Sequence, residues 1–331
     1  MGPALIAWLK GLPGMKWSPR EDTPDSHLQK AGIPSMGGIG IIGAAFGIFL
    51  VIMMSLAAAW PLTRIIFGSP LLTFALHFVF PAVVVLHAFL GFIDDWSKAR
   101  GNGGLLSRQK LFGQVVIAIG LVAFIIFLQP SSTSFSSRSI GDWVIAIVLV
   151  ILIIGTSNAV NLTDGIDGLA AGLSVQVACF FLFVIGGIFP PLWESNSVLI
   201  FWLCLGGACL GFLAFNKYPA KVFMGDTGSL ALGAALGAGA ILTRTVFLLP
   251  FIGFVFFVEM FSVIFQVLYF KYTKKRTGEG KRIFRRAPLH HHFELGGWSE
   301  WRVVGTFWAV NLATSILGLV LWKMGILPRF P

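Results

Sequence analysis

The chain has 331 residues, of which 56% are apolar and only 11% are charged, and its formal net charge is +10. Soluble domains are usually about 45–50% apolar and about 25% charged. The composition therefore excludes an ordinary soluble enzyme, a disordered chain and a disulfide-rich secreted scaffold, and it indicates an integral membrane protein. The three cysteines all lie in apolar runs, so we expect them to be small core residues rather than disulfide partners.

Nine apolar runs are candidates for membrane helices, each of which needs about 20 mainly apolar residues. They are residues 39–60, 71–93, 111–128, 143–155, 169–189, 198–215, 229–242, 247–270 and 303–322. The fourth run is short unless it continues into residues 156–160, and the seventh is rich in Gly and Ala and should pack tightly. We therefore predict an all-α integral membrane protein, a polytopic bundle of about nine transmembrane helices that forms one domain over residues 1–331.

The basic residues are divided unevenly between the two sides of this predicted bundle. With a cytoplasmic N-terminus, 19 of the 24 Lys and Arg residues fall on the cytoplasmic side. The positive-inside rule favours this orientation. In a soluble protein the excess of positive charge would suggest nucleic acid, but here its placement accounts for it and we expect no nucleic-acid partner. Acids, amides and histidines gather on the same side, which predicts an active site on the cytoplasmic face.

Two adjacent carboxylates, Asp94 and Asp95, end the second run, and Lys98 follows one turn later. They could form a solvated helix end with Lys98 as their partner. Two carboxylates are also what a Mg²⁺–phosphate site requires, because Mg²⁺ prefers oxygen ligands and keeps several of its waters.

Amide and acid side chains recur where the fourth run ends. Asn158, Asn161 and Asp164 are spaced by three, so a helix would place them on one face, and Asp167 follows. Glycines after the two acids loosen the backbone where a ligand could approach. So many polar groups at one helix end favour a binding role over a purely structural one.

A third acidic position, Asp226, precedes the seventh run in the sequence GDTGS. Asp226 could simply cap the helix that follows, with Thr227 and Ser229 assisting. It is nevertheless a third carboxylate on the same predicted face as Asp94 and Asp95.

Three consecutive histidines, His290, His291 and His292, stand among several basic residues. Zinc sites usually use wider spacing, and consecutive helical residues cannot all point at one ion, so zinc is disfavoured. Histidine with Arg and Lys better suits a pyrophosphate or another anion. Glu259, inside the eighth run, is a functional candidate, a buried structural carboxylate, or a point where the helix breaks.

Several glycines match patterns that need no ligand. The stretch GIGIIG at residues 38–43 fits a dinucleotide-binding pattern, but it enters a membrane helix without a βαβ unit, so we take the match as accidental. Gly43 with Gly47, and Gly233 with Gly237, are spaced by four, which favours close helix packing.

Five stretches, taken together and in this order, resemble the phospho-N-acetylmuramoyl-pentapeptide-transferase branch of the polyprenyl-phosphate N-acetylhexosamine-1-phosphate transferase superfamily. They are SHLQKAGIPSMGG, GFIDDWSK, SNAVNLTDGIDGLA, PAKVFMGDTGSLALG and APLHHHFELGGW, and the likeness extends from about residue 24 to residue 308. The histidine-containing stretch is the one more specific to this branch. The resemblance implies Mg²⁺-dependent transfer of phospho-MurNAc-pentapeptide from UDP-MurNAc-pentapeptide to undecaprenyl phosphate, which gives lipid I and UMP.

The resemblance also implies roles for individual residues. Asp94 and Asp95 would be catalytic at the lipid-phosphate site, with Asp94 the preferred base, and the catalytic Asp226 would bind Mg²⁺. The residues that would bind substrate, or hold loops that do, are Lys30, Ser35, Lys98, Lys110, Asn158, Asn161, Asp164, Asp167, Phe223, Gln266, Ala287, His290, His291 and His292.

The chain departs from the family pattern in its N-terminal region and at individual positions. The family usually has a further membrane helix before the basic N-terminal stretch, and residues 4–9 resemble only its cytoplasmic end. Ile33 lacks a hydroxyl that the family carries, whereas Ser35 keeps its own, and Arg286 replaces a common Met beside the histidines. The resemblance further implies a homodimer in the bacterial inner (plasma) membrane.

Two other functions compete with this interpretation. A related transferase that uses UDP-GlcNAc or another UDP-HexNAc would share the acids, but it would not be expected to carry the histidine stretch. A transporter would have charges at the bilayer midplane and internal repeats, whereas only Glu259 is central here and no repeat is evident.

Overall fold

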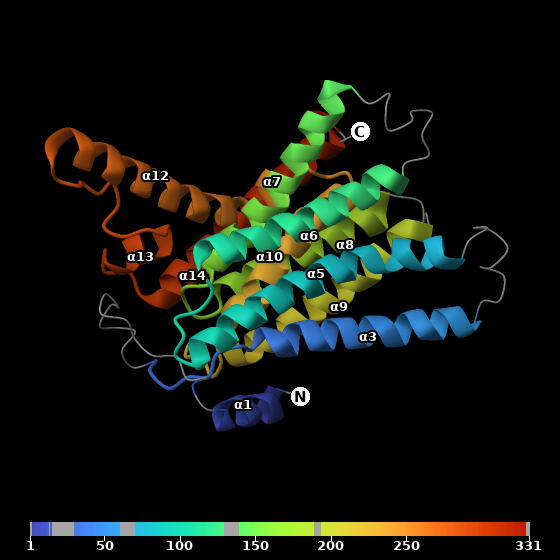
Figure 1. The fold of residues 1–331 in the computed structure, drawn as a ribbon, viewed down its shortest axis with the longest axis horizontal. Coiled ribbons are helices and arrows are strands. Elements are labelled where there is room, and N and C mark those ends of the chain that lie inside the picture. The colour runs from blue at the N-terminus through green and yellow to red at the C-terminus, as the bar shows by residue number, and fades with distance from the viewer. Residues whose placement is uncertain are drawn as a thin grey trace.

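The computed structural model describes residues 2–12, 14, 30–59, 70–128, 139–188 and 193–328, and every regular element within these ranges is a helix. The helices are α1 (Gly2–Gly11), α3 (Gly38–Ala59), α5 (Pro70–Ala99), α6 (Ser107–Leu128), α7 (Ile140–Thr163), α8 (Leu169–Ile188), α9 (Trp193–Asn216), α10 (Gly225–Leu242), α11 (Leu249–Ile252), α12 (Phe254–Thr277), α13 (Leu289–Glu294) and α14 (Glu300–Lys323). Most of the long helices form one bundle, from which α12 projects (Figure 1).

In the described part of the chain, eight helices are long and apolar enough to cross a membrane. The remaining predicted run is α8, whose apolar portion Leu169–Val184 is shorter. The prediction of an all-helical, polytopic membrane bundle is confirmed. The fourth run does continue, because α7 ends only at Thr163. Its polar residues bond inside the bundle: the Ser157 hydroxyl donates to the carbonyl oxygen of Leu230 at 3.0 Å.

Helix α10 lies at the centre of the bundle, and all its residues from Thr227 to Ile241 are buried. A Cβ added at Gly233 would collide with the backbone of α7, so glycine lets the two helices approach closely. The close packing predicted for this run and for the Gly233–Gly237 pair is confirmed. The prediction for the other pair finds no support among the described residues of a single chain. A Cβ at Gly43 or Gly47 would have no described atom within 4 Å, because neither faces a neighbouring helix closely.

The eighth run is divided into α11 and α12 at Gly253. The backbone N–H of Val255, in the first turn of α12, donates to Asn311 Oδ1 at 3.3 Å. Asn311 Nδ2 in turn donates to the carbonyl oxygen of Ile252 at 3.1 Å. One side chain of α14 therefore satisfies backbone groups on both sides of the break. The suggestion that the helix breaks at Glu259 is wrong, since that residue lies inside continuous α12.

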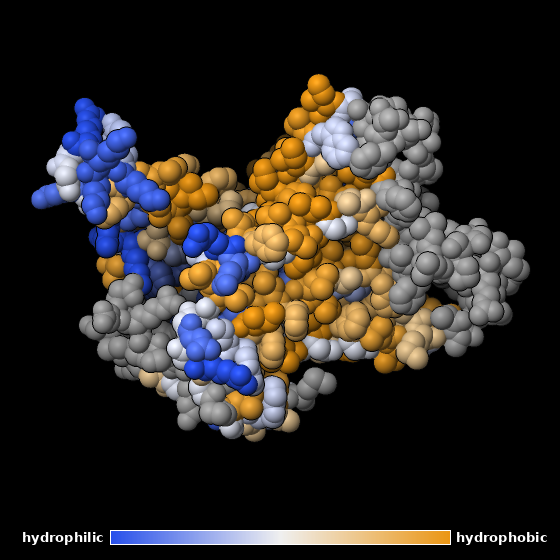
Figure 2. Space-filling view, in the orientation of Figure 1, coloured by the Kyte–Doolittle hydropathy of each residue, from blue (hydrophilic) through white to orange (hydrophobic). Residues whose placement is uncertain are grey.

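The molecular surface is apolar along the bundle and hydrophilic at one end (Figure 2). The hydrophilic end carries the turn between α5 and α6, helix α13 and the far tip of α12 (Figures 1 and 2). Exposed apolar side chains along the helices, such as Ile48, Val51 and Leu203, suit contact with lipid.

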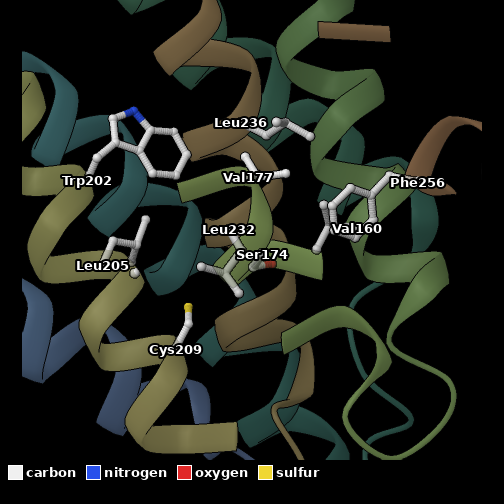
Figure 3. A pocket seen from close by; sticks show the side chains of 10 residues that line it. Val160, Ser174, Val177, Trp202, Leu205, Cys209, Leu232, Leu236 and Phe256 are labelled. Atoms are coloured by element: carbon white, nitrogen blue, oxygen red, sulfur yellow. The ribbon is translucent and has the colours of Figure 1, made fainter. Parts of the chain in front are cut away.

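A small cavity inside the bundle is almost wholly apolar. Trp202, Leu205 and Cys209 of α9 face Val160 and Phe256 across it (Figure 3). This chemistry offers nothing to a phosphate or a metal ion, so the candidate site lies elsewhere.

The three cysteines are free, as expected, but only two are core residues. Cys204 and Cys209 are buried, whereas Cys179 is exposed, because it lies on the outer face of α8.

Candidate active site

The carboxylates of Asp94, Asp95 and Asp226 come together where α5 ends and α10 begins. One oxygen from each lies within 4.8 Å of the others, and this is the single group of three or more potential metal ligands among the described residues. Gly91 makes this approach possible, because a Cβ there would collide with the backbone of Asp226. The three acids that sequence analysis grouped on one face therefore form one acidic cluster.

Asp95 caps the first turn of α10 from a neighbouring helix. Its oxygens accept hydrogen bonds from the backbone N–H groups of Asp226 (3.1 Å) and Thr227 (2.9 Å), and from the Thr227 hydroxyl (2.7 Å). A helix N-terminus has unpaired N–H groups and a partial positive charge, so a carboxylate is a favourable partner. Asp95 thus positions Asp226 as well as contributing its own charge.

Asp94 is bound by groups of a different kind. Its Oδ1 accepts the backbone N–H of Leu105 at 2.7 Å, whereas Oδ2 lies 2.6 Å from Lys98 Nζ and 3.0 Å from Lys110 Nζ. The same two ammonium groups reach Asp226 Oδ2, at 3.0 Å and 2.5 Å. The lysines that sequence analysis assigned to substrate phosphates therefore neutralise the acidic cluster in this structure.

Amide side chains of α7 and α6 form hydrogen bonds beside the acidic cluster. Asn161 Nδ2 donates to Asp226 Oδ1 and to Ser229 Oγ, both at 2.8 Å. Asn158 Nδ2 donates to Gln114 Oε1 at 3.0 Å. Asn161 thus contacts the cluster directly, while Asn158 joins two helices. Gln114 was missed by sequence analysis, although its spacing of four from Lys110 on α6 was a usable signal.

Asp164 lies in the loop after α7. Burial, and then the negative charges of Asp226, Asp95 and Asp167, raise the pKa of Asp164 to about 8. This carboxyl group therefore keeps its proton to a higher pH than an ordinary aspartic acid does.

The same loop joins two distant parts of the chain. Asp167 accepts hydrogen bonds from Lys30 Nζ at 2.7 Å and from the backbone N–H of Ala220 at 2.8 Å. Lys30 Nζ also donates to Glu300 Oε1 at 2.7 Å. Lys30 therefore holds loops in this structure, which was one of the two roles that sequence analysis gave it. Glu300 was missed, because an acid in the first turn of a helix needs no special explanation.

The three histidines make three different contacts. His290 is fully buried, and its backbone N–H and Nδ1 lie 3.0 Å and 3.2 Å from the carboxylate oxygens of Glu259. His291 Nδ1 lies 2.8 Å from Glu294 Oε2, and burial lowers the pKa of His291 against the opposing effect of Glu294. His292 Nδ1 accepts the backbone N–H of Arg285 at 3.1 Å. The three rings do not converge as the ligands of one ion.

His290 also connects the histidine stretch with the loop after α7. A Cβ added at Gly165 would collide with the His290 ring, so the ring lies directly against this glycine. Glu259 is a buried carboxylate that orients His290. It therefore matches the interpretation of Glu259 as a buried structural carboxylate.

The remaining predicted residues lie around these groups. Gln266 binds backbone groups of Ile283 and Phe284, so in this structure it holds the loop before α13. Ala287 is half-buried in that loop. The Phe223 backbone N–H donates to the carbonyl oxygen of Pro34 at 2.8 Å, which brings Ser35 beside the start of α10.

Substitution of Gly225 by alanine is expected to reduce activity strongly. Its φ is +74°, which costs an L-residue about 1–2 kcal/mol, and the new Cβ would lie 2.6 Å from Asp95 Oδ2 and 3.0 Å from Ser35 Oγ. Gly278→Ala is the matched control, since its φ is +82° but its Cβ would have no described atom within 4 Å. Both variants should lose some thermal stability in detergent, but only Gly225→Ala should lose most turnover; equal activities would contradict the close approach.

Comparison with known proteins identifies the family. Residues 77–244 match the family model described as glycosyl transferase family 4. Phospho-N-acetylmuramoyl-pentapeptide-transferases from Shouchella clausii and Anoxybacillus flavithermus are 43% and 45% identical to the chain, each over 96% of it and 92% of the relative. That of Desulforudis audaxviator is 42% identical over 96% of the chain and 93% of the relative. The chain therefore belongs to glycosyl transferase family 4 and, within it, to the phospho-N-acetylmuramoyl-pentapeptide-transferase family.

Proposed function

We propose that this membrane protein transfers phospho-MurNAc-pentapeptide from UDP-MurNAc-pentapeptide to undecaprenyl phosphate, which yields lipid I and UMP. An oxygen of the lipid phosphate attacks the sugar-linked phosphorus of the donor, and the bond from that phosphorus to the bridging oxygen breaks as UMP leaves. The observation that supports this chemistry best is the acidic cluster of Asp94, Asp95 and Asp226 with Lys98 and Lys110 on its carboxylates. Homology over nearly the whole chain supports the choice of substrates.

The acidic cluster fits a magnesium ion. Its donors are all carboxylate oxygens, which Mg²⁺ prefers, and the two lysines already show that the cluster attracts positive charge. Asp226 would hold the ion, with Asp94 beside it. When bound, Mg²⁺ would screen the negative charge of the two reacting phosphates.

Besides neutralising the carboxylates, Lys98 and Lys110 would bind substrate phosphates. Among the described residues, the ammonium groups of Lys98 and Lys110 pair with carboxylates of the acidic cluster, so they can turn to substrate phosphates when those arrive. Asp94 Oδ2 then loses its ammonium partners and can take a proton from the lipid phosphate. Asp95 is less available to a substrate proton, because its oxygens stay bonded to the N-terminus of α10.

The proposal also assigns an orientation. The hydrophilic end in Figure 2 would face the cytoplasm, where the soluble donor is found, and the lipid phosphate would reach the cluster from the bilayer interface. Location in the bacterial inner membrane and assembly as a homodimer follow from the family resemblance; cross-linking of the protein in its native membrane would test the dimer.

The test is UMP release by the purified protein in detergent with undecaprenyl phosphate. UDP-MurNAc-pentapeptide and UDP-GlcNAc are supplied in separate reactions, each with Mg²⁺ and again with a chelator. The proposal predicts release only from the first donor and only with Mg²⁺. Release from UDP-GlcNAc alone would show that the protein is the related UDP-GlcNAc transferase instead. Turnover that survives chelation would show that the reaction does not require Mg²⁺.

A further inference from the structure

Glu300, the first residue of α14, joins segments that lie far apart in the chain. Its Oε1 accepts hydrogen bonds from Lys30 Nζ at 2.7 Å and from the backbone N–H of Asp167 at 2.6 Å. We propose that Glu300 is a positioning residue for the nucleotide-linked donor, which acts through Lys30 and the loop after α7. This inference rests on the function proposed above.

The group formed by Lys30, Asp167 and Glu300 is largely hidden from water. The side chains are 10%, 1% and 11% exposed, so one ammonium is shared by two carboxylates in a protein interior. Taking three charges out of water contributes little net stability, because desolvation offsets their attraction. Removal of one partner is nevertheless costly, since the others are left without compensation. Such an arrangement is better suited to fixing a geometry than to stabilising the fold.

The geometry that Glu300 fixes is that of the loop between α7 and α8. The backbone N–H of Asp167 bonds to Glu300, and the next N–H, of Gly168, donates to Asn216 Oδ1 at 3.1 Å. Two successive backbone groups of this loop are therefore held by side chains from other segments. The same loop carries Asp164, whose carboxyl group experiences the charge of Asp226.

The loops attached to Glu300 surround the acidic cluster. Asp167 also accepts the backbone N–H of Ala220, in the loop between α9 and α10. Farther along that loop, the Phe223 N–H donates to the carbonyl oxygen of Pro34, close to Lys30 in the chain. Glu300 thus holds two segments directly, and through Asp167 it is linked to a third that leads to the start of α10.

These segments are placed to bind the water-soluble donor rather than the lipid acceptor. They lie at helix ends, where α7 finishes at Thr163, α8 starts at Leu169 and α14 starts at Glu300. The isoprenoid chain of the acceptor requires apolar helix surface within the bilayer instead. Loosening the Glu300 contacts should therefore weaken donor binding and leave acceptor binding nearly unchanged.

The test compares Glu300→Ala and Glu300→Gln with the wild type, and Glu279→Gln serves as an exposed acidic control. Glu300→Ala loses the hydrogen bonds to Lys30 and to the Asp167 N–H, and it is expected to raise the KM for the UDP-linked donor about tenfold, the equivalent of about 1.4 kcal/mol. The KM for undecaprenyl phosphate should change by less than about twofold and kcat by less than about threefold. Glu300→Gln should restore much of the donor affinity, because its amide oxygen can still accept the Asp167 N–H.

A purely structural role would give a different pattern. It would lower the melting temperature and the active fraction while the donor KM stayed as in the wild type, and that result would overturn the proposal. An equal rise in both KM values would overturn it too. If Glu300→Ala does not fold, Glu300→Gln decides: a donor KM unchanged from the wild type contradicts the inference, and a rise of about threefold supports it.

Failure of the proposed function would be recognised separately, because the wild type would then release no UMP from the donor. In that case, UMP is used as a binding probe, and its stabilisation of the protein against heat is measured. Weaker stabilisation of Glu300→Ala than of the wild type would support the inference. Equal stabilisation of the two, or none of either, would overturn it.

Discussion

Replacement of Asp226 by asparagine is expected to lower the rate of UMP release about a thousandfold or more, the equivalent of about 4 kcal/mol in the barrier. Asp226 Oδ2 is the atom on which both Lys98 and Lys110 converge, and Oδ1 is fixed by Asn161. Asparagine preserves the shape but removes the charge that would hold Mg²⁺ and both ammonium groups. The measurement is the initial rate at saturating substrates over a Mg²⁺ titration.

The control for this variant is thermal stability in detergent, which should stay close to that of the wild type. The substitution removes two ion pairs of Asp226, but both lysines keep Asp94 as a partner and the repulsion among three carboxylates is relieved, so the fold should be preserved. A rate within about tenfold of the wild type at saturating Mg²⁺ would exclude Asp226 as the residue that holds the metal.

The second large effect is expected at the two adjacent acids, and it should separate them. Asp94→Asn should reduce kcat by about a hundredfold to a thousandfold with little change in stability, because Asp94 is the proposed base. Asp95→Asn should also lose activity, but together with about 1–2 kcal/mol of stability, because both Asp95 oxygens accept N–H groups of α10 and the amide NH2 of asparagine cannot accept one. The two readouts are the initial rate and the melting temperature in detergent, measured on both variants.

The matched comparison lies within the pair itself, since both changes replace a buried carboxylate by the same amide. If Asp95→Asn proved as stable as Asp94→Asn, the capping role would be contradicted. If Asp94→Asn retained a rate within a few-fold of the wild type, it would be ruled out as the base.

The architecture could be predicted from hydropathy, but several helix boundaries could not, and two of them have a clear physical reason. The fourth run ended too early, because Ser157 and Asn158 appear polar in sequence although they bond to Leu230 and Gln114 inside the bundle. The break at Gly253 was hidden by continuous hydrophobicity on both sides of it. Its stabilising partner, Asn311, comes from a helix that starts 47 residues later than the break. Hydropathy averages report burial in lipid, and they carry no information on which polar groups find partners.

The chemistry of the site could be predicted from the sequence where residues of one kind cluster. Asp94 and Asp95 were recognised as a pair, topology placed Asp226 on the same predicted face, and the family resemblance implied a shared site; the structure brings the three carboxylates together. The different roles of Asp94 and Asp95 could not be predicted from the sequence, because they depend on which backbone N–H groups face each oxygen. Glu300 is the extreme case: its partners are 133 and 270 residues away, so no local pattern distinguishes it from an ordinary helix-terminal acid.

The most direct test of the account is the mass of the lipid product formed when both donors compete in one reaction. The purified protein is incubated with undecaprenyl phosphate, Mg²⁺ and equal amounts of UDP-MurNAc-pentapeptide and UDP-GlcNAc, and the lipid fraction is analysed by mass spectrometry. We predict a single new species, undecaprenyl pyrophosphate linked to MurNAc-pentapeptide, with UMP in equal amount. Recovery of unchanged undecaprenyl phosphate, or of a lipid that carries GlcNAc, would contradict the proposed function.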